Sequence, residues 1–192
     1  DLENEGKLDA FRADLAAERS WPLRWWHFRR IHRIFGIKFL SMVTGGARLD
    51  TATEDFWRRL GFAVVQGYGM TETAALISLN NPFSARAGSL GEVLSGRENV
   101  RIGEGGEILV RGKNVSPGLW GDQTRPDDEW LATGDIGSYD ETGRLYFKGR
   151  KKDVIVTAAG LNIYPGGLEA ALDAQPETIA CTVVGVEGEH GP

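Results

Sequence analysis

The fold class can be read from residues 37–72, IKFLSMVTGGARLDTATEDFWRRLGFAVVQGYGMTE. The apolar run over residues 37–44 predicts one strand, and residues 62–66 predict a second. Between them, Thr51 and Glu54 have the spacing of a capping box, which indicates the start of a helix. A strand, a helix and a strand in this order predict an α/β unit with a parallel pair of strands.

Upstream of this unit the sequence predicts two helices. The first covers residues 7–19, and the second begins at Ser20, has a Pro in its first turn and runs to about Phe35. Residues 21–35 combine Trp, Phe, Ile and Arg, so two interpretations stay open. The helix either packs on the rest of the domain with its Arg side chains outward, which we favour, or lies on an anionic membrane surface.

Downstream of residue 88 the sequence pattern changes and predicts short strands separated by Gly turns. A hairpin is predicted around Gly103–Gly106, and the region as a whole predicts a small β-barrel or curled sheet. After residue 153 we expect two short strands, a helix opened by Pro165, and a buried strand over residues 179–186.

Composition narrows the possible functions. The chain has 192 residues, a net charge of −5 and a single cysteine, Cys181. Nucleic acid is therefore not the expected partner, and no intrachain disulfide is possible. We expect a cytoplasmic protein, with peripheral membrane contact only through residues 21–35. Residue 1 is Asp and the chain stops in a turn, so we expect a segment of a longer protein.

The first candidate site is Gly67-Tyr68-Gly69-Met70-Thr71-Glu72, directly after a predicted strand. An aromatic ring between two glycines can stack on a flat ligand that approaches the backbone closely. The hydroxyl of Thr71 and the carboxylate of Glu72 suit a phosphate oxygen and Mg²⁺. A tight turn with a buried Tyr explains the same residues equally well.

Two further stretches carry candidate polar groups. Asp135 follows Thr133-Gly134 and can accept hydrogen bonds from a vicinal diol, or can close an Asx-turn on its own backbone. Arg150, in Gly149-Arg150-Lys151-Lys152-Asp153, can bind a ribose or a phosphate, or can belong to a solvated linker. Taken alone, each stretch favours the structural interpretation.

Together, these stretches resemble one family closely, the adenylate-forming enzymes, which include acyl-CoA synthetases of the long-chain-fatty-acid–CoA ligase type. The resemblance covers nearly all of residues 37–187 and keeps the order of six motifs: Gly45-Gly46-Ala47, Gly67–Glu72, Gly88–Gly91, Gly106–Gly112, Trp130–Asp135 and Gly149–Pro165. It implies a large N-terminal domain that contains an α/β sheet unit and a small β-barrel. The start of a small α+β domain would follow.

The resemblance also implies roles for the nucleoside-binding residues. Gly45, Gly46 and Ala47 would lie against the adenine, and Tyr68, followed by Gly69, would stack on it. Asp135 would bind both ribose hydroxyls, and Arg150 would reach the ribose as well.

For the chemistry, the resemblance implies that Thr71 contacts the α-phosphate and that Glu72 helps to hold Mg²⁺. Lys152 would be the hinge residue about which the small domain swings. The substrates would be ATP, CoA and a small carboxylic acid of the fatty or another apolar type. The acid would be activated as acyl-AMP and then transferred to CoA.

The resemblance divides the chain into three parts. Residues 1–149 would belong to the large domain, with residues 1–87 as its α/β part and residues 88–149 as its β-barrel part. Residues 150–153 would form the hinge, and residues 154–192 a truncated small domain. The family's phosphate loop and catalytic lysine are missing, so we expect the isolated chain to be inactive. A non-catalytic nucleotide-binding module and a domain that loads a carrier protein stay open as alternatives.

Overall fold

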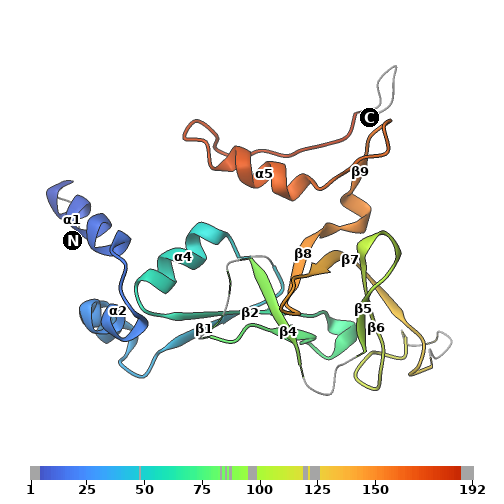
Figure 1. Cartoon of the computed structure of the whole chain (residues 1–192), viewed down its shortest axis with the longest axis horizontal. Coiled ribbons are helices and arrows are strands. Elements are labelled where there is room, and N and C mark those ends of the chain that lie inside the picture. Colours follow the sequence, from blue (N-terminus) through green and yellow to red (C-terminus); the bar gives the residue numbers. More distant parts are fainter. Residues whose placement is uncertain are drawn as a thin grey trace.

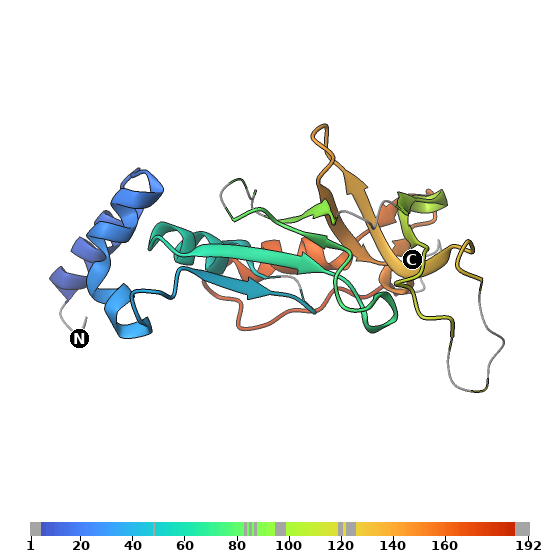
Figure 2. The same ribbon diagram turned by 90° about the horizontal axis from the view of Figure 1, so that it is seen from below.

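The computed structural model describes most of the chain: residues 5–47, 49–82, 84, 86, 88–94, 99–118, 121 and 126–186. The molecule is elongated, with the N-terminal helices at one end of a long sheet and strands β5, β6 and β7 toward the other (Figures 1 and 2). A C-terminal segment with helix α5 runs back along the side of the sheet on which α4 lies (Figure 1).

The sheet has eight strands in the order β1-β2-β3-β4-β8-β7-β6-β5. Strands β1 and β2 are parallel, and every other neighbouring pair is antiparallel. The bounds are β1 Ser41–Thr44, β2 Ala63–Tyr68, β3 Ser78–Leu79, β4 Ser89–Val93, β5 Val100–Ile102, β6 Glu107–Val110, β7 Leu131–Tyr139 and β8 Leu145–Arg150. The predicted parallel strand–helix–strand unit is therefore confirmed. The strands after residue 88 continue the same sheet, and among the described residues they form a curled, open sheet with β5 at its edge, without closing into a barrel.

Helix α4, Thr51–Arg59, connects β1 to β2, but its cap differs from the prediction. The N-cap is Asp50, whose carboxylate accepts a hydrogen bond from the Thr53 backbone N–H at 2.8 Å. Glu54 is fully buried and accepts a hydrogen bond from Gln66 Nε2 at 2.9 Å. The capping-box interpretation was wrong because Glu54 points toward the sheet, where it ties α4 to β2.

The N-terminal helices pack against α4 and β2 through one aromatic cluster. Their bounds are α1 Glu5–Ala16, α2 Trp21–His27 and α3 Arg29–Phe35. The predicted helix over residues 20–35 is thus interrupted at Phe28, which is buried. The His32 ring is also buried, lies 4.1 Å from the Phe62 ring centroid and binds the Leu60 carbonyl through Nε2 at 2.9 Å. Because a carbonyl oxygen only accepts, Nε2 carries the proton.

This packing bears on the membrane question for residues 21–35. The helices are anchored through Phe28 and His32, as the packing interpretation requires, while Leu23 and Ile34 stay 59% and 82% exposed. In the part of the chain that the structure describes, no helix has both the length and the apolar content needed to cross a bilayer.

The second core cluster lies inside the curled sheet, beneath the candidate site. It consists of Tyr68, Ile77, Leu90, Ile108, Val110, Val115 and Leu145. Tyr68 is thus part of a packed core as well as a candidate ligand contact. Three 3₁₀ turns join the strands here: η1 Thr71–Thr73, η2 Glu104–Gly106 and η3 Lys151–Asp153.

The C-terminal part has its own small sheet, formed by β9 Ile155–Val156 and β10 Asn162–Ile163, followed by α5 Pro165–Asp173. The predicted strands and the helix opened by Pro165 are found. The buried strand expected over residues 179–186 is wrong, because this segment has no strand pairing and Ile179, Val184 and Val186 are largely exposed. Its apolar run meets no neighbouring strand among the described residues.

Candidate nucleotide site

Tyr68 forms the floor of the candidate site. It is the last residue of β2, it is 9% exposed, and its hydroxyl donates a hydrogen bond to Asp135 Oδ2 at 2.7 Å. Burial, with a further contribution from the Asp135 carboxylate, raises the pKa of Tyr68 above its ordinary value. The phenol therefore stays protonated at neutral pH and continues to donate to Asp135.

The two glycines beside Tyr68 permit close approach and not the sharp turn that the sequence suggested. Neither Gly67 nor Gly69 has a positive φ. A Cβ on Gly69 would lie 1.7 Å from the Ala75 carbonyl oxygen, so any side chain there would collide with backbone. The chain folds back on itself at this point, and Ala75 takes a left-handed φ of 73°.

Asp135 is presented by a bulge in β7. Glu107 pairs with Ile136 and Leu109 pairs with Ala132, so three residues of β7 stand opposite one residue of β6. Gly134, in the middle of the bulge, has φ 73°, and the Asp135 backbone N–H donates to Thr133 Oγ1 at 3.1 Å. Bulges of this kind re-aim side chains next to functional sites. The Asx-turn interpretation is wrong, because the Asp135 carboxylate turns toward Tyr68.

Arg150 completes the cluster from β8, where it is the register partner of Asp135. Its Nη1 lies 3.0 Å from Asp135 Oδ1, without the alignment of a hydrogen bond to that oxygen. The Arg150 side chain is 52% exposed whereas that of Asp135 is 6% exposed. A buried carboxylate is thus held between a phenol and a guanidinium. It keeps acceptor capacity, because two carboxylate oxygens offer about four lone-pair sites.

These residues line a cavity of about 230 Å³. Its walls are Gly46, Ala47, Gly67, Tyr68, Gly69, Met70, Leu90, Asp135, Phe147 and Arg150. The fold thus brings together the candidate residues of four separate motifs. Gly45 does not line the cavity. It lies close to it, since a Cβ added to Gly45 would stand 3.4 Å from the Gly67 carbonyl oxygen. Met70 and the apolar walls Leu90 and Phe147 were missed as site residues, because only the fold shows which strand residues face a cavity.

Thr71 and Glu72 lie beside the cavity and do not line it. Both are exposed on η1, and the Glu72 carbonyl accepts a hydrogen bond from the Ser116 backbone N–H at 2.6 Å. The described residues contain no cluster of three or more side chains that could hold a metal ion on their own. A single exposed carboxylate fits Mg²⁺ that is also bound by ligand phosphates and water.

Lys152 lies on η3, the 3₁₀ turn that directly follows β8, and its side chain is exposed. It lies two residues after Arg150, which lines the cavity, and is not itself part of the lining.

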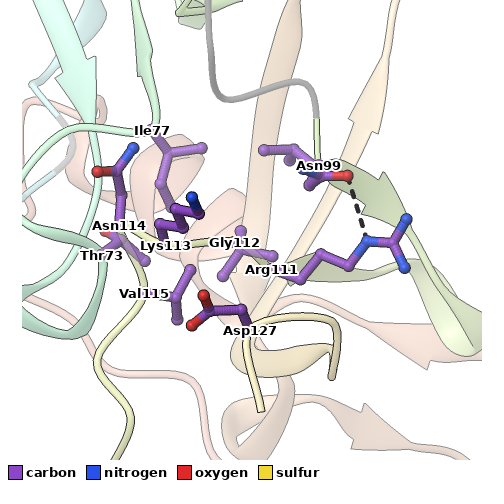
Figure 3. Close-up of a pocket in the computed structure, with 11 residues that line it drawn as sticks. Thr73, Ile77, Asn99, Arg111, Gly112, Lys113, Asn114, Val115 and Asp127 are labelled. Carbon is purple, nitrogen blue, oxygen red and sulfur yellow. Dashed lines mark hydrogen bonds between the residues drawn. The ribbon is translucent and has the colours of Figure 1, made fainter.

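A larger cavity, of about 410 Å³, has Thr73, the last residue of η1, in its lining (Figure 3). Thr73, Ile77 and Val115 form part of its wall, and Arg111 reaches away from them to donate from Nε to Asn99 Oδ1 at 3.2 Å (Figure 3). None of the predicted site residues lines it. We place the candidate site in the smaller cavity, because the buried charged cluster lies there.

Comparison with known proteins agrees with this geometry. Residues 9–120 match the family model described as AMP-binding enzyme. The chain belongs to this family of AMP-binding enzymes, and the predicted membership and α/β fold class are confirmed.

Two relatives illustrate the similarity in sequence. The long-chain-fatty-acid–CoA ligase FadD15 of Mycobacterium bovis is 36% identical over 162 residues, which cover 82% of this chain and 27% of the relative. The 2-succinylbenzoate–CoA ligase of Geobacillus kaustophilus is 36% identical over 168 residues, which cover 79% of this chain and 34% of the relative. The chain therefore spans about a third or less of the length of these relatives.

Solved structures agree as well. The O-succinylbenzoate CoA synthetase MenE of Bacillus subtilis, in complex with ATP and a magnesium ion, superposes with a TM-score of 0.68 and 32% identity. This match covers 78% of this chain and 34% of the other. The same enzyme in complex with the acyl-adenylate intermediate OSB-AMP gives a TM-score of 0.71 at 26% identity. This match covers 91% of this chain and 42% of the other.

Proposed function

We propose that this chain is the nucleoside-binding segment of an ATP-dependent carboxylate–CoA ligase. The observation that carries the proposal is the cluster of Tyr68, Asp135 and Arg150 at the wall of the 230 Å³ cavity. Strand β2 and the hairpin of β7 and β8, which lie more than 60 residues apart in the sequence, converge on one buried carboxylate with unused acceptor capacity. Relatives that are acid–CoA ligases support the same reaction class.

In the proposed complex the adenine enters between Tyr68 and the backbone of Gly45, Gly46 and Ala47. Gly69 lines the same cavity and lets the backbone of Ala75 pack directly behind it. The ribose hydroxyls donate to the lone pairs of Asp135 that Tyr68 leaves unused, and Arg150 binds the ribose from the solvent side. A carboxylate that is shielded from water forms stronger hydrogen bonds than an exposed one. The burial of Asp135 therefore strengthens its proposed hydrogen bonds to the ribose.

The phosphates would extend past the mouth of the cavity toward η1. There Thr71 would donate its hydroxyl to the α-phosphate, and Glu72 would hold Mg²⁺ together with phosphate oxygens. When bound, Mg²⁺ offsets the negative charge of the phosphates. The exposure of both side chains supports this role, because they stay available to a ligand.

The proposed reaction has two steps. A carboxylate oxygen of the acid attacks the α-phosphorus, the bond to the bridging oxygen breaks, and pyrophosphate leaves as acyl-AMP forms. The sulfur of CoA then attacks the acyl carbon, the thiol proton is released to solvent, and AMP leaves. This chain contributes mainly position, since a fixed nucleoside presents the α-phosphorus to the acid.

We further propose that the acid is fatty or otherwise apolar. Relatives named as long-chain-fatty-acid–CoA ligases support an apolar acid.

We propose a division of the chain at residues 150–153, with Lys152 as the hinge between residues 1–149 and residues 154–192. The main sheet ends at Arg150, and the strands that follow pair only with each other, which supports a boundary here.

Isothermal titration of the 192-residue chain with AMP tests the nucleoside site. We expect binding that Asp135→Asn weakens by about thirtyfold, since each of two hydrogen bonds to a charged acceptor loses about 1 kcal/mol. Unchanged affinity in that variant, or no binding by the parent chain, would overturn the assignment.

A pyrophosphate-release assay with ATP, Mg²⁺ and a panel of fatty acids tests the expected inactivity of this chain. No release is expected, because these 192 residues contain neither the family's phosphate loop nor its catalytic lysine, and no Gly-x-x-x-x-Gly-Lys-Ser/Thr loop replaces the first. Sustained release would show that groups within this chain suffice for the first step.

A further inference from the structure

Glu107 is a buried carboxylate that lies next to the candidate site and has no role in the binding scheme above. It is the first residue of β6 and is 7% exposed. Its Oε1 accepts a hydrogen bond from the Gly134 backbone N–H at 3.2 Å, and its Oε2 accepts one from Lys151 Nζ at 2.7 Å. Neither partner is near Glu107 in the sequence, so the fold has gathered three elements around it.

The two partners of Glu107 flank the two residues proposed to bind the ribose. Gly134 immediately precedes Asp135, and Lys151 immediately follows Arg150. Asp135 and Arg150 are themselves register partners across β7 and β8, with their charged atoms 3.0 Å apart. One carboxylate therefore holds the chain on both sides of the ion pair.

The bulge explains why an acceptor is needed at this place. Three β7 residues stand opposite a single β6 residue, so their backbone groups cannot all pair in the ladder. The Asp135 N–H finds a side-chain acceptor in Thr133, and the Gly134 N–H finds one in Glu107. Without Glu107, the Gly134 amide would lose the acceptor that fixes the direction in which the bulge points.

Stability alone is a poor explanation for this arrangement. Burying a carboxylate costs solvation energy that an ion pair regains only with good geometry. The Lys151 side chain is 61% exposed, so the pair has one solvated partner that gives up little solvation to bind. What the pair does achieve is to hold η3 against β6, directly beside Arg150.

We propose that Glu107 is a positioning residue for the nucleotide, which holds Asp135 and Arg150 at the spacing of a ribose diol without touching the ligand. It acts through the Gly134 amide on one side and the Lys151 ammonium on the other. This inference rests on the proposed nucleoside site and adds a residue to it.

The test is titration calorimetry with two probes, AMP and 2′,3′-dideoxy-AMP, which lacks both ribose hydroxyls. Three variants are compared with the parent chain: Glu107→Gln, Lys151→Met and Lys151→Arg. Glu107→Gln should weaken AMP about tenfold, the lower end of the loss seen when a partner that orients a metal-binding side chain is removed. Lys151→Met should weaken AMP severalfold, and Lys151→Arg, which keeps the cation, should bind like the parent. Dideoxy-AMP affinity should stay within about twofold throughout.

Lys148→Met is the matched control. Lys148 is an exposed lysine on the same strand as Arg150, and no ion pair to it is found among the described residues. It should leave both affinities unchanged. If Glu107→Gln fails to fold, the exposed Lys151→Met decides the question, because its substitution leaves the core intact.

Equal weakening of both probes would assign Glu107 a purely structural role and overturn the inference. So would unchanged AMP affinity in Lys151→Met. If the parent chain binds AMP and Asp135→Asn weakens that binding, either of these two outcomes refutes only the role of Glu107 and leaves the nucleoside site intact. If the parent chain binds neither probe, the nucleoside site itself fails.

Discussion

Gly69→Ala should be among the most damaging single-methyl changes in this chain. The added Cβ would lie 1.7 Å from the Ala75 carbonyl oxygen and 2.6 Å from its carbonyl carbon. Both are backbone atoms, so no side-chain rotation can relieve the contact. Residues 74–76 would have to move by roughly 1.5 Å or more to restore a normal distance. Ala75 already has a left-handed φ of 73°, which leaves little freedom to move.

Overpacking of this kind costs about 1–3 kcal/mol and sometimes more. For a chain of this size, each kcal/mol lowers the unfolding midpoint by about 2–4 °C, so a drop on the order of 5–10 °C is expected. Thermal unfolding followed by tryptophan fluorescence measures it. AMP affinity should fall as well, because Gly69 lines the cavity.

Two other glycines separate the causes. Gly134→Ala meets no atom within 4 Å, but it must adopt φ 73°, which costs about 1–2 kcal/mol. Gly166→Ala, in the first turn of α5, has open space and ordinary φ, so it should stabilise by about 0.5–1 kcal/mol. If Gly69→Ala unfolds within about 1 °C of the parent and binds AMP normally, the steric reasoning is refuted.

Three further predictions concern single polar groups. Tyr68→Phe removes the donor to Asp135 and leaves a buried carboxylate oxygen short of a partner, so urea unfolding should show a loss of about 1–3 kcal/mol; an unchanged midpoint would contradict it. Asp50→Ala removes the N-cap of α4 and should cost about 1 kcal/mol, whereas Asp50→Asn should recover most of that loss. Hydrogen bonds, first from the Thr142 hydroxyl, lower the pKa of Asp140 to about 2, so its contribution to stability is present above the ordinary value of 3.8 and is lost as pH falls toward 2. In the Asp140→Asn variant the unfolding midpoint should therefore fall less steeply than in the parent as pH drops from about 4 to 2. An equally steep fall would refute the contribution of Asp140 to stability.

The sequence predicted the candidate site better than it predicted the local geometry. Tyr68, Asp135 and Arg150 could be named because their motifs, taken together and in order, resemble those of the adenylate-forming enzymes, whereas the residue types of any one motif did not decide between a ligand contact and a structural role. That they meet at one carboxylate follows from strand pairing, which brings Asp135 opposite Arg150. The bulge at Gly134 was not foreseen, because spacing within one strand does not show what the neighbouring strand contains.

Glu107 was missed as a functional residue for a related reason. Its partners, Gly134 and Lys151, are remote in sequence, and a Glu at the start of an exposed-looking hairpin gives no local signal of burial. The strand expected over residues 179–186 failed for the opposite reason. An apolar run shows a preference for burial, but pairing needs a neighbouring strand, and none lies beside this segment among the described residues.

The bulge in β7 has a consequence for insertions and deletions. Side chains of a strand alternate between its two faces, so adding or removing one residue inverts the face of everything beyond it. The bulge inserts an even number of extra residues, so Ala132 and Ile136 keep the same phase relative to β6. Length variants in this segment should therefore survive in steps of two. Deletion of Gly134 alone would turn Asp135 to the wrong side of the sheet, however well the remaining residues matched.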